Sequence, residues 1–266
     1  KGSLIIRREK DGIRRYVHVA TGNYNASTAK LYTDLGIFTC SDTFGADASA
    51  FFNLLSGYSD PPVWDSFLVA PINLRERCVA LIDREIQHVK NGETGHIIAK
   101  MNSLLDSRMV DKLYEASQAG VKIELIVRGI CVLIPGIPGV SDNITVRSLV
   151  GRFLEHSRVF WFNNGGREEL YIGSADWMPR NLNDRVELMI PVKDTDCMHR
   201  IKNMVLKELA DNQKAHIMQS NGTWVKMIAS ENKVCAQEYF QKLAEQRSEQ
   251  EKMTLKQKFE PYVPVK

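Results

Sequence analysis

His156 and Arg158 are the first residues in the sequence whose types and spacing could support chemistry together. They lie two residues apart at the start of the apolar run VFWF, and side chains two apart on a β-strand face the same side. A histidine can act as a nucleophile or a proton shuttle near neutral pH, and an arginine offers a planar fork that suits phosphate. The turn Gly173-Ser174 ends the next strand-like run and lets a backbone amide and a hydroxyl approach the same anion. This combination favours phosphoryl transfer.

A similar turn occurs earlier in the chain. The segment Ala20-Thr21-Gly22-Asn23 aligns with Gly173-Ser174-Ala175-Asp176, and each follows an apolar run. At the same distance after each turn, an acidic residue opens the next apolar run: Asp34 in the first copy and Glu187 in the second. This matched spacing indicates an internal repeat.

The repeat also assigns counterparts to the basic residue and to another histidine. Lys1 aligns with Arg158 if the first hairpin is longer than the second, and His18 aligns with Tyr171 rather than with His156. We therefore expect His18 to be a packing residue. A single histidine at the start of a strand is more often structural than catalytic, but the spacing, the turn and the repeat favour a catalytic His156. The residues predicted to line the phosphate site at the two turns are Thr21, Gly22, Asn23, Gly173 and Ser174.

The segments that must position these residues alternate between strand-like and helix-like patterns. This rhythm predicts an α/β fold with a mostly parallel sheet covered by helices. The strands are expected at 66–71, 96–102 and 121–129, and the helices at 74–92, 106–120 and 198–213.

The first part of the chain has a different pattern. Two strand-like runs joined by Lys10-Asp11-Gly12 predict a hairpin, and a helix-like run ends at Gly57. The segment Asp60-Pro61-Pro62 then interrupts any regular structure. We place a domain boundary here, with one domain at 1–66 and a second at 67–266. The second domain is expected to end in a helix that frays into a charged tail from about residue 245.

Composition excludes several classes of protein. Hydrophobic residues make up 44% and charged residues 25% of the 266 residues, as in ordinary globular proteins. A net charge of +3 is too small to mark a nucleic-acid binder. The five cysteines form no C-x-x-C pair, which indicates reduced thiols rather than a zinc site. No apolar run approaches the roughly 20 residues of a membrane span, so we expect a soluble cytoplasmic protein. The first residue is lysine, so we also expect a partner segment upstream.

Longer segments resemble a known family. HVATGNYNASTAKLYTDLGIFT, FLEHSRVFWFNNGG and YIGSADWMPRNLNDRVELMIPV are similar to the C-terminal half of bacterial ATP-dependent polyphosphate kinase, from Lys1 to about Met227. The two copies of H-x-[KR] followed by G-[ST]-x-[ND] resemble the phospholipase D superfamily. The resemblance implies a phospholipase D-like α/β fold, with two mixed β-sheet units related by a pseudo-two-fold axis and flanked by helices.

The resemblance also implies a reaction and a set of site residues. The family transfers the terminal phosphoryl group of ATP, reversibly, to inorganic polyphosphate through a phosphohistidine in an H-x-K motif. Lys1 matches the lysine of that motif, so the histidine is expected two residues upstream. His156 matches the second family histidine, a general acid or base. The residues that the resemblance assigns to ATP or phosphate binding are Tyr32, Arg128, His156, Lys1 and Arg158, and weaker candidates are Lys100, Asn102 and Arg185.

Further expectations concern cofactors and partners. The resemblance implies Mg²⁺ held by residues upstream of this chain, and no metal ligand within it. The expected partners are ATP or ADP and inorganic polyphosphate, with no nucleic acid. The full-length enzyme is expected to be a homo-oligomer in the cytoplasm or peripheral at the membrane. The 266-residue chain alone is predicted to be inactive.

Two alternatives stay open at this point. A phospholipase D-like phosphodiesterase would use the same two histidines with water, although Arg158 replaces the usual lysine and Asn163 stands where an acid is expected. A polyanion-binding or oligomerisation module would need no catalysis at all. Tyr32 has a plainer interpretation as well, as a half-buried aromatic at a strand edge.

Overall fold

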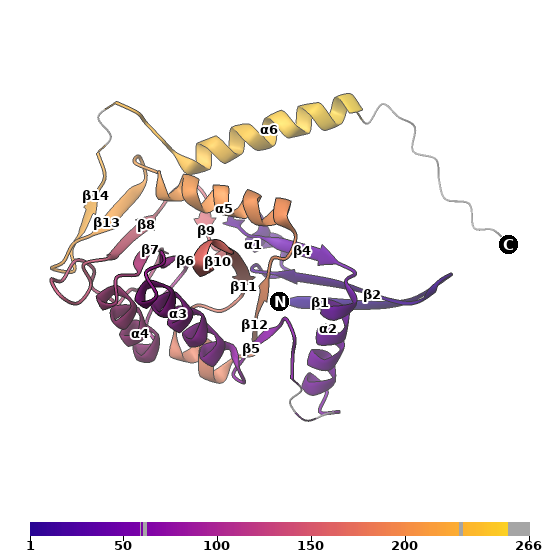
Figure 1. Ribbon diagram of the computed structural model, residues 1–266. Helices are drawn as coiled ribbons and strands as arrows, with labels where there is room; N and C mark the ends of the chain where they lie inside the picture. Colours follow the sequence, from indigo (N-terminus) through magenta and orange to yellow (C-terminus); the bar gives the residue numbers. More distant parts are fainter. Residues whose placement is uncertain (59, 61–62, 229–230, 255–266) are drawn as a thin grey trace.

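A nine-stranded mixed sheet forms the centre of the molecule in the computed structural model, which describes residues 1–58, 60, 63–228 and 231–254 (Figure 1). The strand order is β14-β13-β8-β7-β6-β10-β11-β12-β5. Their bounds are β5 Leu68–Ala70, β6 His96–Met101, β7 Lys122–Val127, β8 Ile144–Leu149, β10 Arg158–Phe162, β11 Glu169–Gly173, β12 Glu187–Pro191, β13 Ala215–Met218 and β14 Trp224–Lys226.

The prediction of a mostly parallel sheet is wrong. Among the paired strands, β6, β7 and β8 run parallel, and the other neighbours in this sheet are antiparallel. Parallel neighbours need a long crossover, which α4 (Ser107–Gln118) supplies between β6 and β7. Between β10 and β11 there is only a short turn with a 3-10 helix at Asn164–Gly166, and a short turn requires an antiparallel pair.

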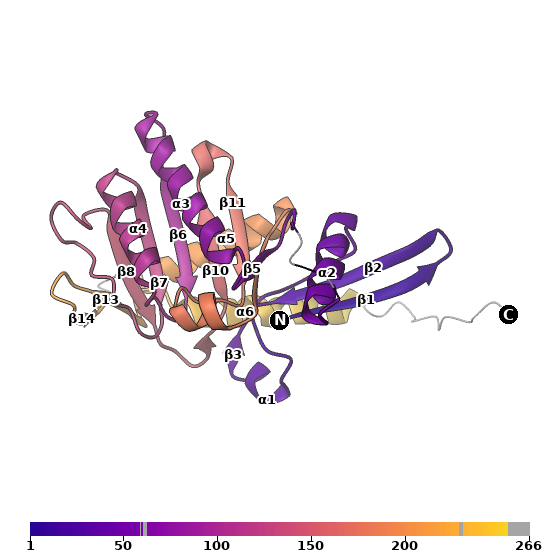
Figure 2. The same ribbon diagram turned by 90° about the horizontal axis from the view of Figure 1, so that it is seen from below.

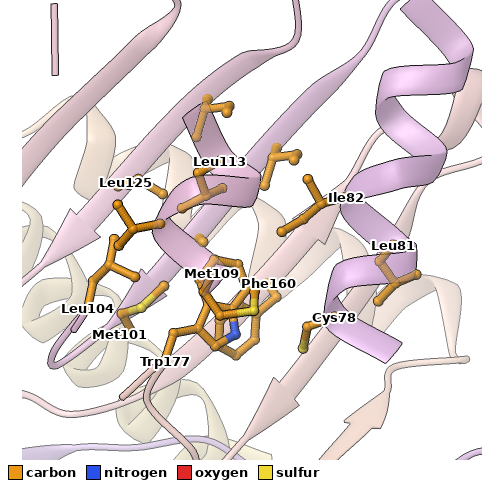
Figure 3. Packing of buried hydrophobic residues seen from close by; sticks show 14 of the residues in the cluster. Cys78, Leu81, Ile82, Met101, Leu104, Met109, Leu113, Leu125, Phe160 and Trp177 are labelled. Carbon is orange, nitrogen blue, oxygen red and sulfur yellow. The ribbon is translucent and has the colours of Figure 1, made fainter. Parts of the chain in front are cut away.

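Helices cover both faces of this sheet, and a hydrophobic core lies under each layer. Below one face, α3 (Leu74–Lys90) and α4 contribute Cys78, Ile82, Met109 and Leu113 to the first core, together with Phe160 of β10 (Figure 3). On the opposite face of the sheet, α5 (Thr195–Leu209) packs Ile201 and Val205 into a second core.

The alternation of side chains along β6 decides which face each residue takes. Ile97, Ala99 and Met101 lie in the core under α3 and α4, and Ile98 lies in the core under α5. Lys100 follows the same alternation and points to the α5 face.

A smaller antiparallel sheet of β1 (Gly2–Glu9), β2 (Gly12–Ala20) and β4 (Gly36–Thr39) precedes the large one. The predicted hairpin is confirmed, and its far end extends away from the rest of the molecule (Figure 2). Helix α2 (Asp42–Leu55) packs on this sheet, and Val17 and Val19 of β2 enter the second core. The two sheets therefore share one hydrophobic core.

A pair of two-residue strands also connects the halves of the chain. β3 (Tyr32–Thr33) follows the four-residue helix α1 (Ala26–Ala29) and pairs in parallel with β9 (Leu154–Glu155). A π-helical turn at Arg180–Asp184 precedes β12. Among the described residues, no helix is both long enough and apolar enough to span a membrane.

The end of the chain and the proposed domain boundary are described in part. Helix α6 covers Ala236–Thr254 and so includes the first part of the tail predicted from about residue 245; residues 255–266 lie outside the described residues, as do Pro61 and Pro62. Asp47 of α2 precedes these prolines in the chain. Its carboxylate accepts backbone N–H groups from the residues that follow them, Asp65, Ser66 and Phe67, at 3.1, 2.7 and 3.0 Å. The boundary at 66–67 stays a prediction.

Candidate active site

The two aligned turns have the same backbone hydrogen bonds. The amide of Thr21 donates to the carbonyl of Leu35, and the amide of Ser174 donates to that of Leu188, each at 2.9 Å. In return, the amides of Leu35 and Leu188 donate to the hydroxyls of Thr21 and Ser174, at 3.0 and 3.3 Å. The aligned segments therefore have one geometry, as the repeat predicts.

Each turn hydroxyl binds the acid that the repeat assigned to it. Thr21 Oγ1 donates to Asp34 Oδ1 at 2.7 Å, and Ser174 Oγ donates to the carboxylate of Glu187. Each acid then faces a group from the opposite copy. His156 Nδ1 lies 2.8 Å from Asp34 Oδ1. These contacts bring the beginning and the middle of the chain to one site.

The second crossed contact joins Lys1 to Glu187. Lys1 Nζ lies 3.7 Å from Glu187 Oε2, a loose ion pair. Glu187 also accepts a hydrogen bond from Asn181 Nδ2 at 2.9 Å, and Arg185 Nη1 lies 4.0 Å away with its side chain half exposed. Two cations therefore gather around this one buried carboxylate.

The surroundings of His156 define which ring nitrogen carries the proton. Asp34 is an acceptor for Nδ1, and Arg158 Nη1 lies 3.0 Å from Nε2. Because a guanidinium only donates, these two partners together select the tautomer with hydrogen on Nδ1. The ring of Tyr32 lies 4.8 Å from the His156 ring, centroid to centroid, which places the predicted nucleotide-contacting tyrosine beside the histidine.

Arg158 is held by protein groups. Its guanidinium donates to both carboxylate oxygens of Asp176, at 3.1 and 3.2 Å, and to the carbonyl of His156 at 2.8 Å. Only 6% of the residue is exposed. In this geometry Arg158 fixes the position of His156, and its predicted phosphate contact stays a prediction.

Arg128 is oriented toward the same region by Asn102. Arg128 Nε donates to Asn102 Oδ1 at 2.9 Å, and the Asn102 amide groups bind Asp176 and the carbonyl of His156. The two Nη groups of Arg128 have no hydrogen-bond partner in the described part of the chain, and the residue is half-buried. Asn102 thus joins Arg128, Asp176 and the histidine segment. From the sequence, Asn102 was predicted only as a weaker phosphate contact. The position of Asn102 directly after β6 is the feature of the sequence that places it at the site.

Lys100 corrects one weaker expectation. The sequence suggested a phosphate contact, but Lys100 is 1% exposed and donates to Glu155 and Glu208 on the α5 face, at 2.7 and 2.5 Å. Strand alternation explains the difference, because Lys100 and Met101 take opposite faces and the site lies beyond the strand end at Asn102.

The other residues of the first turn differ in exposure. Thr21 and Gly22 are buried, and a Cβ atom on Gly22 would lie 2.4 Å from Asp34 Oδ2, so glycine is required for the close approach of the acid. Asn23 is exposed. His18 stacks on Phe38 at 4.2 Å and its Nδ1 lies 2.7 Å from the Tyr24 hydroxyl, while burial lowers its pKa. His18 therefore packs on the smaller sheet, away from the crossed contacts.

Over the described ranges, no group of three or more His, Cys, Asp or Glu side chains could hold a metal ion. Asp34 and Asp176 are already bound to His156 and Arg158. These residues do not fit a resident magnesium site.

A mixed sheet with helices on both faces, carrying two matched turns whose acids cross between the copies, is a phospholipase D-like fold. Residues 1–61 match polyphosphate kinase C-terminal domain 1, and residues 67–237 match polyphosphate kinase C-terminal domain 2. The chain belongs to the polyphosphate kinase family.

Individual relatives agree with this assignment. A polyphosphate kinase of Synechocystis is 56% identical over 225 residues, covering 85% of this chain and 31% of that protein. One from Halalkalibacterium halodurans is 49% identical over 253 residues, covering 94% and 36%. The crystal structure of polyphosphate kinase from Porphyromonas gingivalis superposes with a TM-score of 0.87 at 39% identity, covering 94% of this chain and 39% of that one. The chain thus spans about a third of the length of these relatives.

Proposed function

We propose that this chain forms the catalytic C-terminal part of an enzyme that reversibly transfers the terminal phosphoryl group of ATP to inorganic polyphosphate. The family supports the substrates, because the matched relatives are polyphosphate kinases. The observation that carries the proposal is the crossed arrangement in which His156 of one copy binds Asp34 of the other.

The same symmetry suggests where the nucleophile lies. His156 stands two residues before Arg158, and Lys1 is the counterpart of Arg158 in the first copy. A histidine two residues before Lys1 would face Glu187 as His156 faces Asp34. Glu187, bound by Ser174 and Asn181, is already held in place to accept a hydrogen bond from such a ring.

The reaction then proceeds by two displacements. In the first, a ring nitrogen of the upstream histidine attacks the terminal phosphorus of ATP, the bond to the bridging oxygen breaks and ADP leaves. In the second, the terminal oxygen of polyphosphate attacks the phosphohistidine and the N–P bond breaks. His156 in its protonated form supplies a proton to the ADP oxygen in the first step and becomes neutral, and Asp34 stabilises the charged ring before that transfer. Arg128, Tyr32 and Lys1 contact the phosphates and the nucleotide.

Magnesium would neutralise charge on the phosphates. As the family resemblance implies, we expect its ligands upstream of this chain. The full-length enzyme is expected to be a homo-oligomer in the cytoplasm or peripheral at the membrane.

Labelling the full-length protein that contains this chain with γ-³²P-ATP tests the proposal. We expect an acid-labile, base-stable label on the histidine two residues before Lys1, and growing polyphosphate chains. His156→Gln should slow labelling by roughly 100-fold, and the exposed His199→Gln on α5 should not change it.

Three outcomes would reject the proposal or favour its alternative. A residue other than histidine at that upstream position would remove the nucleophile. Unchanged labelling in His156→Gln would remove His156 from the chemistry, and release of an alcohol from a phosphodiester would favour the hydrolytic alternative instead. The 266-residue chain alone is expected to synthesise no polyphosphate.

A further inference from the structure

A buried ion cluster lies behind the candidate active site, on the α5 face of the sheet. Lys100 Nζ donates to Glu155 Oε2 at 2.7 Å and to Glu208 Oε1 at 2.5 Å. All three side chains are at most 5% exposed. They come from β6, β9 and α5, so the cluster joins the central sheet to the helix above it.

Glu155 connects this cluster to the segment that carries His156. Its carboxylate also accepts hydrogen bonds from Thr33 Oγ1 at 2.8 Å and from Gln237 Nε2 at 2.6 Å. Thr33 and Glu155 are register partners in the β3–β9 pair. The next residues along these two strands are Asp34 and His156, which form the crossed contact. A shift of Glu155 would therefore move both members of that contact.

Gln237 in the first turn of α6 holds the same segment from outside. Its Oε1 accepts the amide hydrogen of Phe153 at 3.0 Å, and its Nε2 donates to the Phe153 carbonyl at 2.8 Å. The amide side chain thus pairs with the backbone of Phe153 as a neighbouring strand would. Asp211 fixes the start of α6 by accepting the Ala236 amide at 2.7 Å.

We propose that Gln237 and the Lys100–Glu155–Glu208 cluster act as positioning residues for His156, and that they set its orientation through the β3–β9 pair. The reaction in which His156 takes part rests on the proposed function, but the positioning itself does not.

The charges of the cluster agree with a fixed geometry. Burial alone would raise the pKa of Glu155, but the charge and hydrogen bond of Lys100 lower it to about 2. Burial raises the pKa of Glu208 to about 8, against the attraction of Lys100. Lys100 and Glu155 therefore form a charged pair, and burial favours the protonated form of the Glu208 carboxyl beside it.

Nitrogen NMR of the histidine rings in the 266-residue chain tests the positioning without requiring activity. The ring of His156, assigned by its absence in His156→Gln, should show the tautomer with hydrogen on Nδ1. Gln237→Leu keeps the size of the side chain and removes its hydrogen bonds, so this pattern should shift toward mixed tautomers. The matched control is Gln241→Leu, one turn further along α6, whose amide binds the exposed Glu245.

Kinetics of the full-length protein give a second readout. Gln237→Leu should lower kcat by about 10-fold and change KM for ATP by less than about 2-fold. If the residue acts through the crossed contact, the same change in an Asp34→Asn background should have little further effect. Thr33→Val removes a donor to Glu155 with little change in shape and should reproduce both results. It serves as the test if Gln237→Leu fails to fold.

The proposal is overturned if Gln237→Leu and Thr33→Val both fold and the His156 ring keeps the tautomer with hydrogen on Nδ1 in each. It is also overturned if the two substitutions multiply in their effects on kcat, because that would indicate a general structural role. If the full-length protein forms no phosphohistidine label but Gln237→Leu still shifts the His156 tautomer, the proposed function is rejected and the positioning proposal stands.

Discussion

Two acids surround His156, and they have different tasks at the level of single residues. Asp34 contacts the imidazole itself, and Asp176 contacts Arg158, which in turn holds the carbonyl and Nε2 of the histidine. In the first copy of the repeat the position of Asp176 is taken by Asn23. The buried arginine of the second copy therefore has a carboxylate partner from its own turn, and Lys1 of the first copy has none from its turn.

Asp34→Asn tests the first of these tasks. The amide keeps an oxygen near Nδ1 but loses the negative charge that stabilises a protonated ring, so we expect kcat in the full-length enzyme to fall by roughly 100- to 1,000-fold. Folding should be affected little. Steady-state synthesis of polyphosphate from ATP measures the effect, with the exposed Asp111→Asn on α4 as the control. A loss below about 3-fold would contradict this role.

Asp176→Asn tests the second task through stability. It leaves the charge of Arg158 buried with no carboxylate, and breaking one side of a buried ion pair typically costs about 3–5 kcal/mol. Urea denaturation of the chain should show a decrease of that size. Asn23→Asp at the aligned exposed position should change stability by less than about 0.5 kcal/mol. Equal effects of the two substitutions would rule out a special role for the buried pair.

At the level of elements, periodicity located most strands and helices but could not fix how they pair. The hairpin at the start and the helices α3, α4 and α5 follow from turn residues and apolar spacing. Periodicity alone does not encode the directions in which β10, β11 and β12 pair, so the sheet was expected to be more parallel than it is. The small pair β3–β9 was missed, because two-residue strands leave no periodic signal.

The candidate site, like the fold, could be predicted only in part from the sequence. Local spacing and the repeat located His156 and the two turns, whereas Tyr32 was assigned by the family resemblance. The crossed contact of His156 with Asp34 joins residues 122 positions apart, and nothing in local spacing indicates it. Lys100 was misplaced for a related reason, since the face of a buried strand is decided by its neighbours when both faces are apolar.

Asp47 gives a prediction at the element level, where α2 is joined to the chain entering β5. Its carboxylate accepts three backbone amides from 65–67, and two of these are buried. Asp47→Ala leaves these donors unpaired, so we expect a loss of roughly 2–4 kcal/mol. Hydrogen exchange should become faster at Ser66 and Phe67. Asp42→Ala in the first turn of the same helix should cost less than about 1 kcal/mol, and similar costs for both would contradict the assignment.

At the level of the whole molecule, the two cores and the buried ion cluster connect all the major elements. Val17 and Val19 of the small sheet share a core with Ile201 and Val205 of α5. The same helix supplies Glu208 to the cluster behind the site. Global unfolding should therefore expose Glu208, and the pH dependence of stability should report on its burial.

Glu208 provides the corresponding prediction. Its folded pKa of about 8 lies above its ordinary value of 4.5, so the folded state keeps a proton that the unfolded state releases between these pH values. The stability contributed by this carboxyl is fully present below pH 4.5 and is lost as the pH rises through 8. Across this window Glu155 remains ionised and Lys100, whose pKa is raised by the two glutamates against the effect of burial, remains protonated.

Glu208→Gln imitates the protonated carboxyl at every pH. Relative to this variant, the unchanged protein should therefore lose up to about 1.4 kcal/mol of unfolding free energy per pH unit within the window. Urea denaturation of both proteins at about pH 5.5, 6.5 and 7.5 measures the slope. Glu238→Gln, exposed on α6, should show no such slope. A difference between wild type and Glu208→Gln that does not vary with pH would mean that Glu208 is ionised in the folded state, and the cluster would then carry a net negative charge behind His156.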